Sequence, residues 1–238
     1  MRTRFRDEQR VGTRWSMITQ VDPSAGTVGA QALAELCARH RYPVYAYLRR
    51  AGRAAVSALD STTQFLDALQ RGLGERGPPP GRQFRRYLLE HLERYLAGDA
   101  HPSGADSAGE ADASDPLETR YARDAARADS PVQAFQRGFA VDLLLRAFAR
   151  LREEAEATGH GDMYTALAPF FARDPLAHEY DALAAALHVR PITVAVALNR
   201  LRQRLHELAG EELADTVSSA AELADEQAAM LAALGETG

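Results

Sequence analysis

The chain has 238 residues, a length that suits one large domain or two small helical ones. Its only cysteine, Cys37, excludes an internal disulfide framework and fits a reducing cytoplasm, and no apolar run approaches the roughly 20 residues that span a bilayer. The net charge of −5 hides an asymmetry: residues 1–97 hold 16 arginines and 9 acidic residues, whereas residues 98–238 hold 12 and 24. We therefore expect a cytoplasmic protein without a membrane segment, and the basic first half is a weak hint of a polyanionic partner.

Apolar residues at helical spacing predict helices in the first half of the chain. The first stripe covers residues 33–48 and is expected to break or kink at Pro43. A second helix includes residues 65–69, and a third runs from about residue 83 to 96. Between them, the stretch "RGPPPG" at 76–81 excludes regular structure, because its prolines fix φ and remove backbone donors.

A stretch of small and acidic residues then divides the chain into two parts. Residues 98–116, "GDAHPSGADSAGEADASDP", contain no arginine and almost nothing to bury, so we expect a flexible linker there. The predicted organisation is a helical domain over 1–97, an acidic linker over 98–130 and a second helical domain over 131–238.

Helix is expected to resume at Pro131, a favourable first-turn residue, with Ser130 as its candidate cap. A shorter helix follows around "MYTALAPFF" at 163–171. No stretch shows the alternation of a β-strand. The predicted fold class is therefore all-α, with two small helical domains joined by a flexible acidic linker.

The window "EYDALAAALHVRPITVAVALNRLRQRL" at 179–205 predicts two helices joined by a tight turn. The first has a short apolar face around Ala184, residues 188–190 form the break, and Pro191 opens the second. A small residue where two helices must cross closely suits a helix-turn-helix, whose second helix would present polar side chains to phosphates and base edges. An ordinary helical hairpin with a solvated arginine face fits the spacing equally well.

Five other segments stand in a recognisable order along the chain. They are "TRWSMI" (13–18), "ALAELCARHRYPVYAYLRRAG" (32–52), "GRQFRRYLLEHLERYL" (81–96), "LLLRAFARLREE" (143–154) and "EELADTV" (211–217). Together with the window at 179–205, they resemble an extracytoplasmic-function (ECF) bacterial RNA polymerase sigma factor. More narrowly, the chain is similar to the branch whose members begin with a "TRWS" segment and tend to be paired with Ser/Thr protein kinases.

The resemblance implies a two-domain, all-α protein that directs polymerase to promoters. The first domain would be region 2-like: it would bind the clamp helices of the β-prime subunit of RNA polymerase, and would open and read the −10 element of promoter DNA. The second would be region 4-like and would read the −35 element in the major groove with its helix-turn-helix. The DNA-binding positions that this match implies are Arg190, Thr193, Asn199, Arg200, Arg202 and Arg204.

In this family the polymerase-facing helix usually carries an acidic cluster of the form DAED, followed by LTQEFF. Here the four cluster positions are Ser57 to Asp60, so two of the three expected carboxylates are missing. Clamp-helix contact in the family is strongly electrostatic, so the unmodified protein is expected to dock poorly. The polymerase-binding residues that the resemblance implies are Ser57, Asp60 and Gln64.

Three hydroxyl residues follow this cluster. A phosphate brings about −1.5 to −2 charges and three acceptor oxygens, which would restore roughly the missing charge. The resemblance therefore implies a phosphorylation switch at Ser61, Thr62 or Thr63, with the threonines favoured because the exposed face of the cluster is expected to continue through them. The alternative is a helix-capping run, in which Asp60 or Ser61 accepts a hydrogen bond from an early backbone N–H.

The match to the family fails at some positions. Where members usually carry a basic run near the −10 DNA, this chain has the acidic linker, whose carboxylates phosphates would repel. The remaining candidates for promoter opening are Arg82, Arg85, Arg86 and Arg94. In the predicted turn His188 replaces a glycine, which histidine tolerates because it visits the left-handed region more readily than most residues. These changes suggest weak or conditional DNA binding.

Two functions stay open, and a third is rejected. The chain is expected to be an active or switchable sigma factor, or a degenerate relative that regulates by binding proteins without recognising promoters. An enzyme is not expected, because the seven histidines are dispersed and no Gly-rich phosphate loop or G-x-S-x-G elbow occurs. We therefore expect no metal and no cofactor. The expected partners are the RNA polymerase core, promoter DNA and a Ser/Thr protein kinase.

Overall fold

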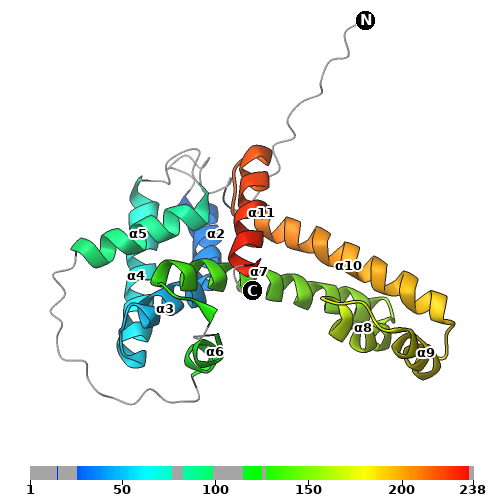
Figure 1. Ribbon diagram of the computed structural model, residues 1–238. Helices are drawn as coiled ribbons and strands as arrows, with labels where there is room; N and C mark the ends of the chain where they lie inside the picture. Colours follow the sequence, from blue (N-terminus) through cyan, green and yellow to red (C-terminus); the bar gives the residue numbers. More distant parts are fainter. Residues whose placement is uncertain (1–14, 16–25, 77–82, 99–114, 125–126, 236–238) are drawn as a thin grey trace, which may run out of the picture. The chain divides into compact units, whose positions relative to one another are not determined.

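Helices make up the regular structure of the chain wherever it is described (Figure 1). The computed structural model describes residues 15, 26–76, 83–98, 115–124 and 127–235. The elements are α2 (Gly26–Arg39), α3 (Arg41–Arg50), α4 (Ala55–Arg76), α5 (Phe84–Gly98), α6 (Pro116–Asp124), α7 (Pro131–Ala157), α8 (Gly161–Leu167), the 3-10 helix η2 (Ala168–Phe170), α9 (Ala177–Ala186), α10 (Pro191–Ala214) and α11 (Ala220–Gly235). No strand occurs in these ranges, which confirms the all-α fold class for them. Within the same ranges, no helix taken singly has the length and apolarity needed to cross a bilayer.

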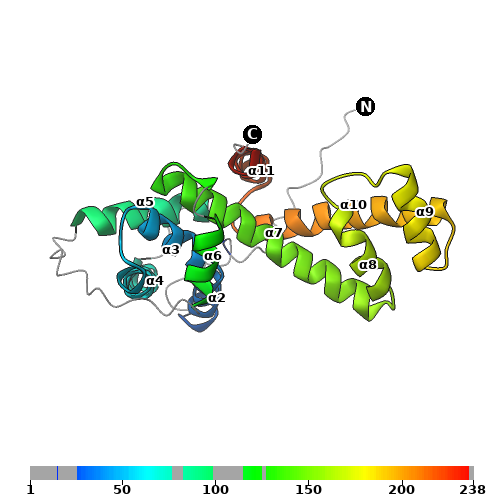
Figure 2. The ribbon, with the colours of Figure 1, turned by 60° about the horizontal axis from the view of Figure 1, so that its bottom comes forward.

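The described residues form two compact units. The first unit contains the described residues up to Asp142 and those from Leu213 onward, and the second contains Leu143–Glu212. The chain passes from the first unit to the second inside α7 and returns inside α10 (Figure 2). This division differs from the expected one, in which a linker over 98–130 separated two sequential domains.

Part of the expected linker is a helix. Residues 99–114 lie outside the described residues, but α6 follows them, and Asp115 caps it by accepting the N–H of Leu117 at 2.8 Å. Glu118 of α6 then accepts hydrogen bonds from Tyr45 and Arg49 of α3, the latter at 2.9 Å. Residues 116–124 of the expected linker are therefore helical, and this helix, which has no fully buried side chain, is held by polar contacts and by the packing of Leu117 and Tyr121 against Tyr42 and Ala46.

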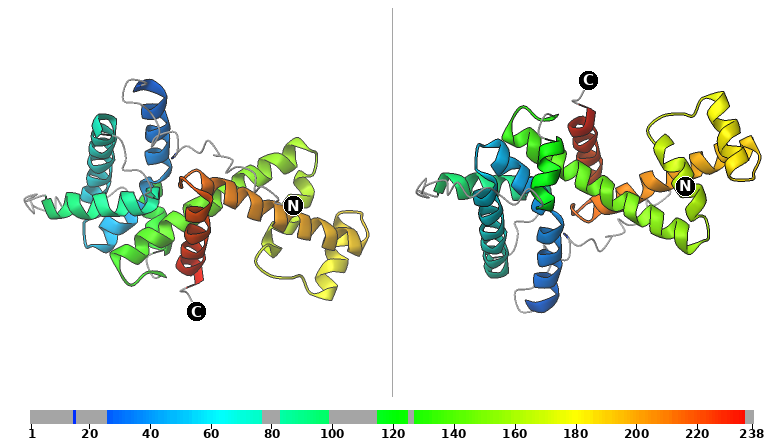
Figure 3. Two further views of the ribbon diagram at one scale, coloured as in Figure 1. Left: turned by 90° about the horizontal axis from the view of Figure 1, so that it is seen from above. Right: turned by 90° about the horizontal axis from the view of Figure 1, so that it is seen from below.

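The core of the first unit forms where α4 packs against both α2 and α3 (Figure 3). Leu36 of α2, Leu48 of α3, Phe65 of α4 and Leu88 of α5 are almost or completely buried. These residues belong to the apolar stripes of the sequence, because one face of each amphipathic helix turns inward. The helices expected around them are confirmed.

The expected break occurs, but at His40 and not at Pro43. Helix α2 ends at Arg39 and α3 begins at Arg41, so Pro43 falls in the first turn of α3, where a missing N–H costs no helical hydrogen bond. His40, between the helices, is buried, and its ring stacks on that of Phe139 with centroids 4.4 Å apart. The break thus places an imidazole in the core of the first unit.

Helix α7 begins at Pro131, as predicted, and its first turn is capped in both directions. The hydroxyl of Ser130 accepts the N–H of Gln133 at 3.2 Å. The side-chain oxygen of Gln133 accepts the N–H groups of Asp129 and Ser130 at 2.8 and 3.1 Å. This reciprocal arrangement is a capping box, and it satisfies three backbone donors that the helix itself leaves unpaired.

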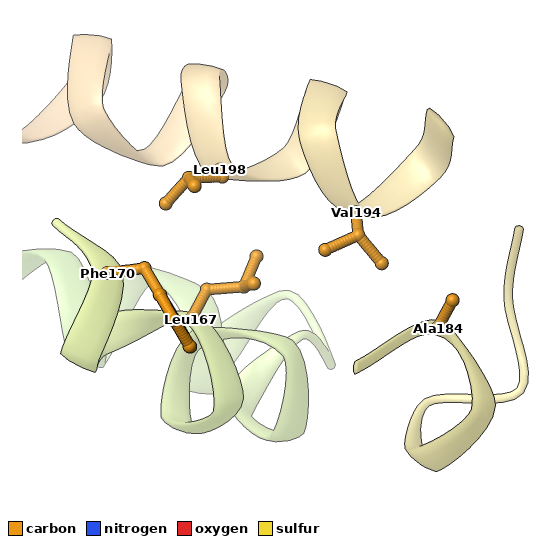
Figure 4. Close-up of a cluster of buried hydrophobic side chains, with 5 residues drawn as sticks. All are labelled: Leu167, Phe170, Ala184, Val194 and Leu198. Carbon is orange, nitrogen blue, oxygen red and sulfur yellow. The ribbon is translucent and has the colours of Figure 1, made fainter. Parts of the chain in front are cut away.

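The second unit contains two apolar clusters. The first joins α8, η2, α9 and α10 and comprises Leu167, Phe170, Ala184, Val194 and Leu198 (Figure 4). The second joins α7 to α10 and comprises Ala147, Leu151 and Leu208. Arginines of α7 add ion pairs beside it, since Arg146 and Arg150 both contact Glu212, at 2.9 and 3.0 Å. Helix α10 therefore holds this unit together along most of its length.

Close contact between α7 and α3 makes Gly138 sensitive to substitution. A Cβ at Gly138 would lie 3.2 Å from the Cα of Pro43 and 3.3 Å from the ring of Tyr42. Tyr42 cannot retreat easily, because its hydroxyl donates to Asp124 and Arg120 lies over its ring. We expect Gly138→Ala to lower the free energy of unfolding by about 1–3 kcal/mol through overpacking, as measured by urea denaturation.

Gly72 in α4 is the matched control for this prediction. A Cβ there meets nothing within 4 Å. Gly72→Ala should therefore raise the free energy of unfolding by about 0.5–1 kcal/mol, because alanine favours the helix. If both substitutions changed stability in the same direction, the close contact at Gly138 would not be the cause.

Candidate functional site

Helices α9 and α10 have the geometry of a helix-turn-helix. They are bent by 96° at the break between Ala186 and Pro191, within the range usual for this motif. In the turn, His188 adopts a φ of 53°, the left-handed conformation expected from the sequence. The N–H of Val189 donates to the carbonyl of Ala184 at 3.0 Å, which closes the end of α9. The two helices meet at Ala184 and Val194, as the small residue predicted (Figure 4).

The six residues expected to bind DNA separate into two groups. Arg190, Thr193, Asn199 and Arg200 are exposed on the turn and on α10. Arg202 and Arg204 are instead occupied by contacts within the second unit. Four of the six thus remain accessible to a phosphate or a base edge.

Arg202 fastens the segment before α9 to α10. Its guanidinium donates to the carboxylate of Asp174 and to the carbonyls of Phe170 and Arg173, each at 2.6 Å. These bonds satisfy carbonyls near the end of η2 that have no helical partner. Arg202 therefore has a structural role that the sequence pattern did not reveal.

Arg204 faces α7. It donates to both carboxylate oxygens of Glu154 at 2.8 Å and also pairs with Glu207 and Glu211 of its own helix, at 3.0 and 3.4 Å. Surrounding carboxylates raise the pKa of Arg204 above its ordinary value, chiefly through the hydrogen bond to Glu154. With three acidic neighbours, Arg204 is a poor candidate for a DNA phosphate.

The accessible side of α10 also carries apolar residues. Ile192 and Val196, one turn apart, are 63% and 44% exposed. Val196, Thr193 and Arg200 line one side of a cavity of about 640 Å³ whose other walls come from α7 and α8. Sequence reasoning missed this hollow, although the four-residue spacing of Ile192 and Val196 was a signal for an apolar stripe outside the core.

The hydroxyl run in α4 occupies the interior of a helix. Helix α4 begins at Ala55, so Asp60 and Ser61 lie too far along it to cap its first turn, and the capping alternative is wrong. Ser61 is buried and accepts a hydrogen bond from Arg53 at 3.0 Å. The run is therefore part of the packed α4 helix.

The two threonines of the run differ in accessibility. Thr62 is completely buried, and its hydroxyl donates to the carbonyl of Ala58 at 2.7 Å. Thr63 is exposed; its hydroxyl donates to Leu59 and accepts from Arg41 of α3, each at 3.1 Å. The prediction that the exposed face continues through Thr62 is wrong, because this residue points into the unit.

Thr63 belongs to an exposed polar stripe on α4. Asp60, Gln64 and Asp67 are exposed with it, at the three- and four-residue spacing of one helix face. Of the residues expected to bind polymerase, Asp60 and Gln64 thus lie on this stripe, whereas Ser57 is half-buried. We call the four exposed residues, Asp60, Thr63, Gln64 and Asp67, the α4 stripe.

The arginines expected to open DNA are not equivalent either. Arg86 and Arg94 of α5 are exposed, and Arg82 lies outside the described residues. Arg85 is buried and forms a two-point ion pair with Glu226 of α11. In the form that the structure shows, Arg85 is therefore not accessible to nucleic acid.

Reactive groups are scarce among the described residues. No cluster of three or more His, Cys, Asp or Glu side chains is placed to hold a metal ion in those ranges. Burial raises the pKa of the Cys37 thiol to about 12, so the thiolate is disfavoured at neutral pH. This cysteine has the environment of a core residue.

Known protein families, curated proteins and solved structures were compared with this chain, and none matches it. Its function is therefore argued from the residues and the geometry above.

Replacing Arg202 tests its structural role. We expect Arg202→Ala to lower the free energy of unfolding by about 1.5–3 kcal/mol, because three acceptors lose a charged donor. The exposed Arg200 is the matched control, and Arg200→Ala should change stability by less than about 0.5 kcal/mol. Urea denaturation followed by circular dichroism measures both, and equal effects would contradict the assignment.

The carboxylate of Glu179 gives a pH test of the first turn of α9. Hydrogen bonds from Arg173, and from the N–H of Leu176 at 2.7 Å, lower the pKa of Glu179 to about 2. Because the pKa is depressed in the folded state, the stabilisation is present above the unfolded value and is lost as pH falls through about 2. NMR titration should show Arg173→Ala moving the Glu179 midpoint upward, and an unmoved midpoint would exclude the pair in solution.

Proposed function

We propose that this protein is a sigma factor of the ECF type, with the α4 stripe as its polymerase-binding surface and Thr63 as a phosphorylation switch. The observation that carries the proposal is the exposure of Thr63 between Asp60 and Asp67. A kinase reaches only accessible hydroxyls, and among residues 61–63 only Thr63 is exposed. The resemblance of the sequence to that family supplies the class of partner.

Electrostatics explains why a phosphate on Thr63 would matter. The α4 stripe has two carboxylates, and the preceding Ser57 and Leu59 stand where the family usually has acids. A phosphate would add about −1.5 to −2 charges in the middle of this stripe. Such a change strengthens attraction to a basic partner surface and affects the association rate most at low salt.

Arg41 gives the switch a definite geometry. Its guanidinium lies 3.1 Å from the Thr63 hydroxyl, so a phosphate attached there would gain a charge-assisted hydrogen bond. The single positive charge of Arg41 offsets part of the added charge but not all of it. The phosphate would thus be held at a fixed place on the α4 stripe while staying net negative.

The four accessible residues of the helix-turn-helix would make the contacts with promoter DNA. Arg190 and Arg200 suit phosphates, and Thr193 and Asn199 suit phosphates or base edges. Two arginines are few for tight binding, since each phosphate contact adds to affinity. We therefore propose that this unit binds promoters firmly only when polymerase holds it nearby.

A second candidate function is a protein-binding regulator without promoter recognition. The exposed Ile192 and Val196 favour it, because they lie beside a cavity on the same helix that would have to enter a DNA groove. Exposed apolar residues beside a hollow are typical of protein contacts.

Charge substitutions in α4 test the proposed switch. We expect Thr63→Glu to bind core RNA polymerase about three- to fivefold more tightly than unmodified wild type at low salt, and the gain to vanish at high salt. Thr63→Gln is the matched neutral control and should show no gain. Fluorescence anisotropy with labelled protein measures each affinity.

Thr62 provides the negative control. Thr62→Glu would force a carboxylate into the core of the first unit, so it should lower the unfolding free energy by more than about 2 kcal/mol without improving binding. If the unmodified wild-type protein bound core polymerase as tightly as Thr63→Glu does, phosphorylation of Thr63 would not be needed for binding and the proposed switch would be wrong. Run-off transcription separates the two functions: a Thr63→Glu protein that binds core but yields no promoter-dependent transcript is a regulator.

A further inference from the structure

The two ends of the chain carry opposite charge. Residues 205–238 contain eight acidic residues and no arginine, whereas residues 1–97 contain 16 arginines and 9 acidic residues. The first unit contains both the described residues up to Asp142 and those from Leu213 onward, so it brings the two ends together. We call residues 213–235 the C-terminal segment.

A buried ion pair joins the C-terminal segment to α5. The Nε and Nη2 atoms of Arg85 donate to the two carboxylate oxygens of Glu226 at 2.5 and 2.9 Å. Only 8% of the Arg85 side chain and 1% of the Glu226 side chain are exposed. Two of the three guanidinium nitrogens of Arg85 are thus directed at a carboxylate that is shielded from water.

Further polar contacts surround this pair at the start of α5. The N–H of Phe84, the first residue of α5, donates to the carbonyl of Thr216 at 2.9 Å. The side chain of Gln83 reaches the carbonyl of Glu222 at 3.5 Å, and Arg39 lies 4.0 Å from the carboxylate of Asp215. The C-terminal segment therefore satisfies both a helix-start N–H and arginines of the basic first half.

Helix α5 also has features that suit single-stranded nucleic acid. Arg86 is exposed beside Arg85, and Arg94 is exposed further along the helix. The rings of Trp15 and His91 lie 5.7 and 3.9 Å from that of Tyr87, but Trp15 and Tyr87 are buried, and the N–H of Trp15 donates to the carbonyl of Asp215 in the C-terminal segment at 3.0 Å. Arginines along one helix suit the backbone of a single strand, and these rings could stack on bases only after the C-terminal segment had moved away.

We propose that the C-terminal segment is an intramolecular cover for a single-stranded DNA site on α5, and that Glu226 holds the place of a phosphate at Arg85. A phosphate presents the same two-oxygen edge to a guanidinium as a carboxylate does, so one can replace the other. The cover must leave before DNA binds. This inference rests on the proposed function for its biological meaning, but it concerns the free protein and requires no polymerase.

If α11 must leave α5 before DNA binds, the apparent affinity for DNA equals the intrinsic affinity multiplied by the fraction of molecules in which α11 has left. Removing the charge of Glu226 shifts that balance, because the closed form would then bury an uncompensated Arg85 cation. We expect Glu226→Gln to bind a fluorescent oligothymidine at least about tenfold more tightly than wild type. The plot of log affinity against log salt should also steepen by about 0.7, the value for one more phosphate contact on a single strand.

Asp225 supplies the matched control, because it neighbours Glu226 on α11 but is exposed. Asp225→Asn removes the same charge and should leave the affinity within about twofold of wild type and the salt slope unchanged. Adding Arg85→Gln to Glu226→Gln should restore the wild-type slope. Equal gains from Glu226→Gln and Asp225→Asn would mean that net charge, not the cover, controls binding.

Hydrogen exchange on the wild-type chain tests the same inference without a substitution. Saturating oligothymidine should speed the exchange of amides in residues 220–235, because α11 leaves α5. Unchanged or slower exchange there, or no binding of oligothymidine by Glu226→Gln, would overturn the cover. The affinity of Glu226→Gln for duplex DNA is measured in parallel. If Glu226→Gln bound duplex DNA more tightly than wild type but oligothymidine no more tightly, the proposal of a single-strand site would be wrong. None of these results depends on whether Thr63 controls polymerase binding, so the two proposals fail separately.

Discussion

The buried pair of Arg85 and Glu226 is the interaction on which the organisation of this chain depends, because it fixes the C-terminal segment to the first unit. Backbone hydrogen bonds from Phe84 to Thr216 and from Trp15 to Asp215 join the same two parts of the chain. Through these contacts the acidic C-terminal segment packs against the basic first part of the chain, and opposite charges pair within the first unit. A buried ion pair is not by itself a strong source of stability, since desolvation offsets much of the attraction. The pair contributes more through its geometry, because its two hydrogen bonds fix one position of α11 against α5.

Local features of the fold were predictable from the sequence, and features that depend on distant partners were not. Ser130 and His188 predicted a cap and a turn, because each acts through backbone groups a few residues away. Ala184 predicted a close crossing, because it packs against Val194 of the next helix in the chain. The burial of Thr62 depends on how α4 packs against α2 and α3, which no local pattern records. The roles of Arg202 and Arg204 likewise depend on carboxylates 28 and 50 residues away. Helix α6 escaped prediction because it is short and offers only Leu117 and Tyr121 to an apolar cluster, too few to show a helical period, while its ion pairs are to α3 and α7.

The surface of α10 decides between the two functions considered for this protein. Intramolecular ion pairs remove two of its arginines, and exposed apolar residues take part of the remaining face. A helix with few available cations binds DNA weakly alone and needs a partner to concentrate it there. The same face also offers a protein an apolar stripe beside a hollow. Under either proposal the α4 stripe would be the polymerase-binding surface, because its acidic groups and Thr63 are exposed on one helix face.

The anchoring of α6 has a consequence for how the first unit responds to its surroundings. Its carboxylates hold Tyr42, Tyr45 and Arg49 of α3, and it contributes no fully buried side chain. Attachment through partly exposed ion pairs weakens as ionic strength rises, whereas apolar packing does not. The first unit therefore combines a salt-tolerant core with one helix whose attachment is partly ionic. At high ionic strength the ion pairs of α6 would weaken, and Leu117 and Tyr121, which pack against Tyr42 and Ala46, would carry more of its attachment.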